Sequence, residues 1–476
     1  MLYGDDEQET FICKNCVGEG YLASQIARSG DERKCSYCES ITQSWTLEEL
    51  SSQIESAFER HYMRTSDQPE SWEVSLLADK ESDYEWERSG TPIVDAIVEA
   101  AEISVTAAED IQEILSDKYY DRYSAEVCEE TEFSSDSYYQ EIGPSDATWR
   151  TEWNRFEQSL KSEARFFSRI AVAHLAAIFG DIHQHKTQNG HNLIVDIGPG
   201  MALEELYRAR IFQSEDKLKE ALCRPDLHLG PPPSHFATPG RMNARGISVF
   251  YGATEPSVAL AEVRPPVGSY VMVAKFRIVR CLRVLDLSAL EFIYAEGSIF
   301  DPSYKNNLER VAFLTSLGKR ITKPVMPDDQ DLDYLATQAI ADFLATENKP
   351  QLDGILFPSV QSESGDNLVL FHKAAKVAEE DFPEGTEIHV SSGHGDEYDG
   401  ENAFYVSEEI PPQDTLNMNE YDNFSWGNSS YDESSDNRVI SLQIDMASVE
   451  VHRIESVEVK SSSCNVTRHR WENRKV

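Results

Sequence analysis

Apolar residues in the first half of the chain, at about 45–179, recur three and four positions apart. This spacing places them on one face of an α-helix, so it predicts a helical region. Pro92 at the start of one run and Gly180 at the end of another match the residues that commonly begin and end helices. The two clearest runs are Ile93, Ile97, Ala100, Ala101 and Val105, and Phe156, Leu160, Ala164, Phe167 and Ala171.

The pattern changes after Asn192 to short runs of β-branched, aromatic and aliphatic residues. Such runs are typical of strands, and helical spacing at 332–344 interrupts them. The second half is therefore predicted to be a mixed α/β domain, and the whole chain to belong to the α+β class. The expected segments are a zinc-binding segment at 1–45, a helical domain at 46–190 and a mixed domain at 191–476. The expected strands are 247–251, 270–278, 284–287, 354–358, 368–371 and 439–444.

Residues 379–437 contain seventeen carboxylates and no Lys or Arg, together with many Ser, Asn and Gly. A stretch of this composition cannot bury enough apolar surface to fold firmly. The β-like run at 439–459 that follows is expected to complete the sheet. Residues 379–437 are therefore predicted to be a mobile acidic insertion within the mixed domain, and not a tail.

The chain of 476 residues is strongly acidic, with 84 Asp and Glu against 43 Lys and Arg and a formal charge of -41. That charge repels nucleic-acid phosphates unless a local basic patch overcomes it, so nucleic acid is not an expected partner. No run of about 18 apolar residues is present, which argues against a membrane-spanning helix. The start of the chain is acidic where a signal peptide would be basic and then apolar. We therefore expect a cytoplasmic protein of two or three folded units, with its oligomeric state left open.

Four of the eight cysteines form two Cys-x-x-Cys pairs near the start of the chain, and the others are scattered singly. Two such turns can point four thiolates at one ion and complete a closed tetrahedral shell. The spacing is that of a zinc ribbon or treble clef and predicts structural zinc. The alternatives are four reduced thiols without metal and a redox pair, which would normally be single and precede a helix. The predicted ligands are Cys13, Cys16, Cys35 and Cys38.

The densest group of chemically special residues is Gly240-Arg241-Met242-Asn243, followed by Tyr251 and Glu262. A turn flanked by glycine leads into a strand that ends at Tyr251, and a helical segment then presents Glu262. Arg can hold a pyrophosphate by bidentate hydrogen bonds, Tyr can stack on a flat heteroaromatic ring, and a carboxylate can stabilise an oxocarbenium-like sugar centre. Cleavage of a nucleotide-sugar bond requires these three functions together.

This group resembles the Gly-Arg-Trp-Asn, Tyr and Glu pattern of RES-domain toxins, and further motifs follow in the family's order over about 200–375 and 438–460. The resemblance implies a fold similar to ADP-ribosyltransferases for the second half. It implies a toxin or defence effector that consumes NAD, by hydrolysis or phosphorolysis of the bond to nicotinamide. It also implies an antitoxin or regulatory protein as a partner. The further motifs are Leu206-Tyr207-Arg208, Gly354 to Ser359, Asn367 to Phe371 and Leu442 to Val459.

Carried over by position, the resemblance gives catalytic roles to Arg241, Tyr251 and Glu262, and substrate-binding roles to Arg208 and Ser359. The two arginines would bind the phosphates and ribose of NAD, and the tyrosine would form a wall of the nicotinamide site. The glutamate would stabilise the ribosyl cation or orient the attacking water or phosphate, and the serine would hydrogen-bond the ribose edge. Met242 stands where the family often has Trp, and Arg245 adds a cation, so the pocket wall is expected to differ.

Each of these residues also has a simpler structural interpretation. Glu262, close to Arg264, would form a surface ion pair of little energetic weight. Tyr251 would pack in the core, and Arg208 would lie on a solvated face. Ser359 would cap or terminate a strand.

The first half resembles the HEPN/RES N-terminal domain in its double Cys-x-x-Cys and its helical body. Arg169 and His174 have the Arg-x4-His spacing of HEPN ribonucleases, in which the two side chains face RNA. The acidic charge and the apolar residues Phe166, Phe167 and Ile170 favour a packed helix instead. Two alternatives to the NAD-consuming enzyme therefore stay open: a HEPN-type ribonuclease that uses Arg169 and His174, and a non-catalytic, zinc-dependent interaction protein.

Overall fold

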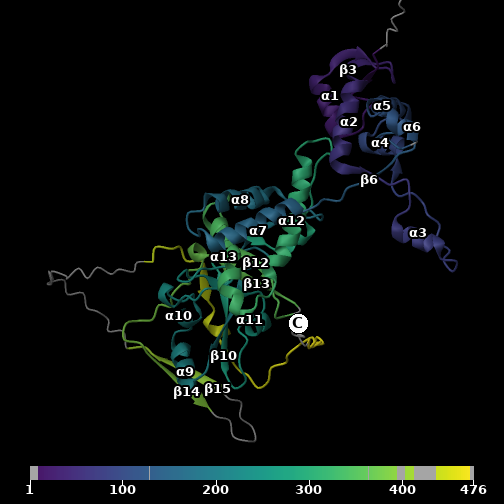
Figure 1. Cartoon of the computed structure of the whole chain (residues 1–476). Coiled ribbons are helices and arrows are strands. Elements are labelled where there is room, and N and C mark those ends of the chain that lie inside the picture. Colours follow the sequence, from purple (N-terminus) through teal and green to yellow (C-terminus); the bar gives the residue numbers. More distant parts are fainter. Residues whose placement is uncertain (1–8, 128, 363, 394–402, 412–435, 472–476) are drawn as a thin grey trace, which may run out of the picture. The chain divides into compact units, whose positions relative to one another are not determined.

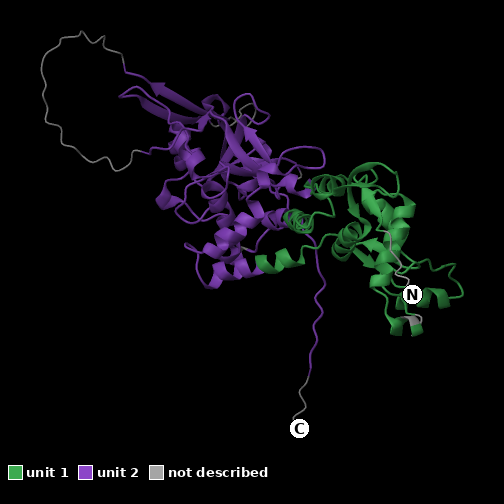
Figure 2. Ribbon diagram, turned by 90° about the horizontal axis from the view of Figure 1, so that it is seen from above, with its two compact units in different colours: residues 1–153, 293–316 green, residues 154–292, 317–476 purple. Residues whose placement is uncertain are grey.

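The computed structural model describes residues 9–127, 129–362, 364–393, 403–411 and 436–471. The chain divides into two compact units, which are coloured separately in Figure 2. Unit 1 comprises Met1–Trp153 and Ile293–Ser316, and unit 2 comprises Asn154–Phe292 and Leu317–Val476. The first segment shares a hydrophobic core with the helices that follow it. The predicted divisions after residues 45 and 190 stay a prediction.

Unit 1 begins with a three-stranded antiparallel sheet in the order β1 (Phe11–Cys13), β3 (Ile41–Thr46), β2 (Asp31–Lys34). The apolar residues of this sheet and of the following helices form one core, to which Ile12 and Leu22 contribute fully buried side chains. A second antiparallel sheet has the order β4 (Tyr62–Arg64), β6 (Tyr138–Glu141), β5 (Thr91–Pro92). The helices are α1 (Gly20–Ser29), α2 (Leu47–His61), α3 (Ser71–Ala78), α4 (Ile93–Ala101), α5 (Val105–Lys118) and α6 (Arg122–Val127).

The helical spacing predicted for this unit is present, but the first predicted run is divided between two helices. α4 ends because Glu102 adopts a left-handed backbone conformation with a φ of 51°, which stops an α-helix. α5 then begins after Ser104, whose hydroxyl accepts a hydrogen bond from the Ala107 N–H and so caps the new helix. The predicted start at Pro92 is confirmed, since Pro92 directly precedes α4.

Unit 2 is built on a nine-stranded sheet. Its strands are β7 (Ile194–Ile197), β8 (Glu205–Phe212), β9 (Phe250–Ala253), β10 (Tyr270–Ile278), β11 (Leu282–Asp286), β12 (Gly354–Pro358), β13 (Asp366–Leu370), β16 (Leu442–Ile444) and β17 (Glu450–Arg453). They run in the order β16-β10-β8-β9-β13-β12-β11-β7, and β17 also pairs with β10. The β11–β12 pair is parallel and the others are antiparallel.

The strands expected in the second half are present, with small shifts at their ends. The predicted strands 270–278 and 354–358 coincide with β10 and β12, and those at 284–287 and 368–371 overlap β11 and β13. The run at 439–459 returns to the sheet, where β16 and β17 both pair with β10. The mixed α/β character of the second half, and the α+β class of the chain, are therefore confirmed.

The second apolar run of the first half is predicted as one packed helix, and this prediction is wrong. The run is divided between two helices: α7 (Ala147–Ser162) ends within it, and α8 (Arg169–Phe179) is a separate helix. Phe166 and Phe167 lie between the two helices and are 89% and 95% exposed, and Ile170 in the first turn of α8 is 74% exposed. The periodicity is therefore coincidental at these positions.

Helices border the sheet of unit 2 (Figure 1). The Ser168 hydroxyl accepts a hydrogen bond from the Ala171 N–H and so begins α8, which ends before Gly180 as predicted. No described helix is long and apolar enough to cross a membrane. The further helices of unit 2 are α9 (Glu215–Cys223), α10 (Pro225–Leu229), α11 (Pro256–Glu262) and α13 (Gln330–Thr346). The helix α12 (Tyr304–Thr322) begins within the residues of unit 1 and ends within those of unit 2. α11 contacts β8 and β9, and α13 contacts β12.

The acidic stretch 379–437 is partly folded, which corrects the prediction that all of it is mobile. β14 (Glu387–Gly393) and β15 (Ala403–Glu409) pair as an antiparallel hairpin. The side chains of Val390 and Phe404 pack against the core of unit 2. Overall composition missed these few apolar residues, which are enough to fix the hairpin. Two parts of the stretch, 394–402 and 412–435, lie outside the described residues.

Candidate active site

One cavity of unit 2, with a volume of about 380 Å³, brings together four of the five residues predicted to act on a substrate. Its size lies in the usual range of small-molecule sites, about 300–1,000 Å³. Strands β8, β9, β12 and β13 contribute to the wall, as do α11, α13 and the end of α12. The fifth residue, Ser359, contacts one of the four. The four lining residues are Arg208, Arg241, Tyr251 and Glu262.

Glu262 is the last residue of α11, and its side chain lines the cavity. Its Oε1 atom accepts two hydrogen bonds, one from the Ser359 hydroxyl and one from the Asn367 side-chain amide, each at 2.7 Å. Within the described ranges no Lys, Arg or His pairs with this carboxylate. The interpretation of Glu262 as a surface ion pair with Arg264 is therefore not supported, and the carboxylate is held by neutral donors.

Arg208 lies in the middle of β8 and presents its guanidinium to the cavity. The Nη1 atom is buried and has no hydrogen-bond partner among the described residues, and the guanidinium carbon lies 4.8 Å from the centroid of the Phe250 ring. Burial, and secondarily the nearby charge of Arg210, lowers the pKa of Arg208 to about 10, because both disfavour the charged form. Arg208 still stays protonated at neutral pH, so it is a half-buried cation, and no carboxylate pairs with it in the described part of the chain.

Arg241 is held at the C-terminal end of α12. Its Nη1 donates to the Ile321 carbonyl, and its Nη2 donates to the Lys323 carbonyl at 2.9 Å. The carbonyl end of a helix carries partial negative charge and so favours a cation. The guanidinium carbon also lies 5.2 Å from the centroid of the Tyr334 ring. A guanidinium has five N–H groups, so these two hydrogen bonds leave the others for a ligand.

Tyr251 uses its hydroxyl to hold the Gly240–Asn243 turn. The hydroxyl donates to Asn243 Oδ1 at 2.9 Å and accepts a hydrogen bond from the Met242 N–H at 3.1 Å. Gly240 is required beside it, because an added Cβ would lie 2.8 Å from the hydroxyl oxygen. Burial raises the pKa of Tyr251 to about 12, so the hydroxyl stays protonated. The ring lines the cavity, while the hydroxyl shapes the turn that carries Arg241.

Asn367, Arg264 and Tyr334 are among the lining residues to which the sequence analysis gave no role in the site. Asn367 could have been found from the sequence, because burying an amide next to apolar strand residues costs free energy unless the amide is hydrogen-bonded. The placement of Arg264 in the cavity wall depends on its left-handed backbone, with a φ of 48°. The placement of Tyr334 depends on how α13 packs. Met242 and Arg245, expected to alter the pocket wall, do not line the cavity; the former is buried in the core.

Arg169 and His174 do not converge on one site. Arg169 is exposed in the first turn of α8, whereas the His174 ring lies 5.5 Å from the ring of Phe156 on α7. Five positions along an α-helix correspond to a rotation of about 140°, so the two side chains lie on different faces. Their geometry gives no support to the ribonuclease hypothesis.

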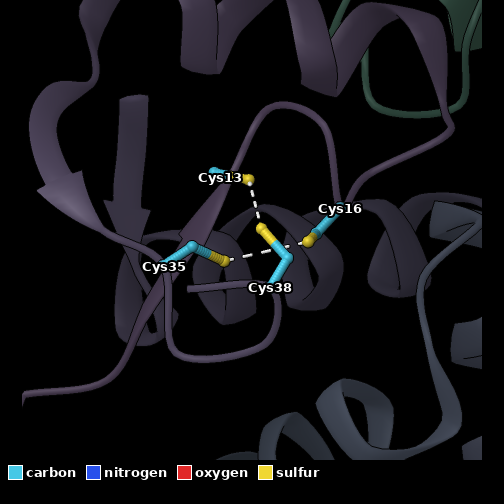
Figure 3. Close-up of side chains that lie close together, drawn as sticks. All are labelled: Cys13, Cys16, Cys35 and Cys38. Carbon is cyan, nitrogen blue, oxygen red and sulfur yellow. Dashed lines mark hydrogen bonds between the residues drawn. The ribbon is translucent and has the colours of Figure 1, made fainter. Parts of the chain in front are cut away.

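The four cysteines predicted to bind zinc converge from two turns that follow β1 and β2 (Figure 3). Their Sγ atoms all lie within 4.8 Å of one another. The Cys13–Cys38 and Cys16–Cys35 pairs have Sγ separations of 3.6 and 3.8 Å. Four thiolates bound tetrahedrally at about 2.3 Å from zinc would stand about 3.8 Å apart. The residues therefore fit a closed structural zinc site, and such an ion would hold the two turns together.

We expect the purified full-length chain to hold about one zinc ion, and the double variant Cys35→Ser, Cys38→Ser to lose it. Because the site is closed and borders the core of unit 1, metal loss should lower the unfolding temperature more than the turnover number. Elemental analysis and calorimetry measure the two effects. Cys281→Ser and Cys464→Ser, at exposed cysteines outside the cluster, are the controls. Zinc content unchanged in the double variant would contradict the assignment.

The cavity of unit 2 thus gathers one carboxylate and several arginines beside strands of a mixed sheet. Residues 206–391 match the family model of the RES domain. The match over this range confirms the resemblance inferred from the motifs. The matched range contains all five of the predicted substrate-contacting residues. No curated protein and no solved structure matches the chain.

Proposed function

We propose that unit 2 binds NAD in this cavity and cleaves the bond between nicotinamide and ribose, by hydrolysis or phosphorolysis. One observation carries the proposal: the same cavity holds an anchored carboxylate, Glu262, and an arginine, Arg208, whose buried Nη1 has no hydrogen-bond partner among the described residues. The RES domain match supports it, because the family resemblance implies NAD as the substrate.

The arginines account for the binding of a dinucleotide. Arg208, Arg241 and Arg264 line the cavity, and none of them forms an ion pair with a carboxylate in the described part of the chain. In a chain with 84 acidic residues, three such cations around one cavity indicate an anionic ligand. The pyrophosphate of NAD carries two negative charges, and its oxygens can accept several of the N–H hydrogen bonds that guanidinium groups donate.

The carboxylate accounts for the chemistry. When the C1′–N bond breaks, its electron pair leaves with nicotinamide and positive charge develops on the ribose. Glu262 would stabilise that charge, an effect on the order of a few kcal/mol for one well-placed group. An oxygen of water or phosphate then bonds to C1′, and with water a proton is released. The Tyr251 ring would form a wall of the nicotinamide site.

The wider biological role follows from the same resemblance. We propose a toxin or defence effector acting in the bacterial cytoplasm and restrained by an antitoxin or regulatory protein. The similarity of the sheet to ADP-ribosyltransferases, and of the N-terminal half to the HEPN/RES N-terminal domain, are parts of this proposal.

Induced expression in bacteria tests the proposal. The cellular NAD pool should fall before growth stops, and a strain expressing Glu262→Gln at the same level should keep both its NAD and its growth. Glu255→Gln is a matched control, because Glu255 is an exposed residue at the other end of α11. Growth arrest with an undiminished NAD pool would overturn the proposal.

A further inference from the structure

Asn367 is a buried polar residue that is followed in β13 by three apolar residues. It is 7% exposed, and Leu368, Val369 and Leu370 after it in β13 are fully buried. Its Nδ2 donates to Glu262 Oε1 at 2.7 Å. The amide orientation is fixed by chemistry, since only the NH₂ group of Asn can donate to a carboxylate. A buried amide at this place is therefore explained by the carboxylate that it contacts.

The backbone on which Asn367 lies is fixed on both sides. It stands opposite Phe357 of β12 and Ala253 of β9, and β13 lies between these two strands. The preceding residue, Asp366, exchanges hydrogen bonds of 2.9 Å with Thr254, which lies just before α11. The strand thus secures both the start of α11 and, through Asn367, the carboxylate at its end.

We propose that Asn367 is a positioning residue for the cleavage reaction. Together with Ser359 it holds the Oε1 atom of Glu262, so that Oε2 faces the ribose. The two donors approach from different elements, because Ser359 follows β12 and Asn367 lies within β13. Two hydrogen bonds to one oxygen stop rotation of the carboxylate, whereas a single bond leaves it free to turn. This inference rests on the proposed function of Glu262.

Asn367→Leu separates positioning from a structural role. Leucine suits a buried strand position better than an amide does, so the variant should keep or raise the unfolding temperature. Its kcat for NAD should fall on the order of tenfold with little change in KM, because a hydrogen bond to a charged group is lost. Asn367→Asp should lower kcat further, because it brings a second negative charge to Glu262. A structural role predicts instead that activity follows stability.

Steady-state NAD kinetics and urea unfolding of the full-length variants complete the test. In a double-mutant cycle with Glu262→Ala, the effect of Asn367→Leu on both kcat and stability should shrink, because its partner is gone. Unchanged kcat in Asn367→Leu, or unfolding effects that simply add in the double variant, would overturn the inference. A wild-type chain that consumes no NAD would refute the proposed function instead, while the unfolding cycle would still decide whether Asn367 and Glu262 are coupled.

Discussion

Glu262→Gln is expected to lower NAD turnover on the order of a hundredfold or more while the protein stays folded. The glutamine amide oxygen can accept the same hydrogen bonds from Ser359 and Asn367 that Oε1 accepts in the wild type. The substitution therefore removes the negative charge and little else. Steady-state kinetics should show the loss in kcat, because the charge matters most when the ribose becomes positive.

The matched comparison is Glu255→Gln, which removes one negative charge from the exposed start of the same helix. It should retain wild-type kcat. Equal turnover in the wild type and Glu262→Gln would show that the carboxylate takes no part in the chemistry, and the mechanism proposed for the cavity would have to be abandoned.

Arg208→Met is expected to weaken NAD binding on the order of a hundredfold and to stabilise the free protein by about 1–3 kcal/mol. The binding loss follows from the removal of charge-assisted hydrogen bonds to phosphate. The gain in stability follows because the buried Nη1 of Arg208 has no partner among the described residues, so an apolar side chain removes an uncompensated cost. The KM for NAD and the free energy of unfolding in urea measure the two effects.

Arg210→Met is the control for this pair of effects. Arg210 lies two residues further along β8, is exposed and donates to the His228 carbonyl at 2.7 Å, outside the cavity lining. Its substitution should leave KM within about twofold of the wild-type value. A destabilised Arg208→Met variant with normal KM would show that Arg208 supports the fold and does not bind substrate.

Much of the sheet could be predicted because its strands are short runs rich in β-branched, aromatic and aliphatic residues. The runs at 270–278 and 354–358 become β10 and β12 without a shift. The candidate site could be predicted for a different reason. Arg241, Tyr251 and Glu262 follow the order and spacing of the RES-domain pattern, and the fold brings them to one cavity. The order of these residues therefore indicated a site that the spacing of apolar residues alone does not reveal.

The features that could not be predicted depend on contacts between segments far apart in the sequence, which a local residue pattern does not reveal. Exposed Phe166 and Phe167 share the apolar spacing of a helix but lie between α7 and α8. The β14–β15 hairpin forms inside a stretch whose overall composition indicates no fold. Asn367 and Ser359 meet Glu262 only through the pairing of β12 with β13 and the placement of α11.

We propose that this chain cleaves NAD at the nicotinamide bond. The most direct measurement is nicotinamide release from NAD by the purified full-length protein, followed by NMR in phosphate and in phosphate-free buffer, with total RNA incubated in parallel. We expect stoichiometric nicotinamide and a ribosyl product, with RNA intact and release abolished in Glu262→Gln. Intact NAD with cleaved RNA would instead establish a nuclease, and both substrates intact would favour the non-catalytic interaction protein.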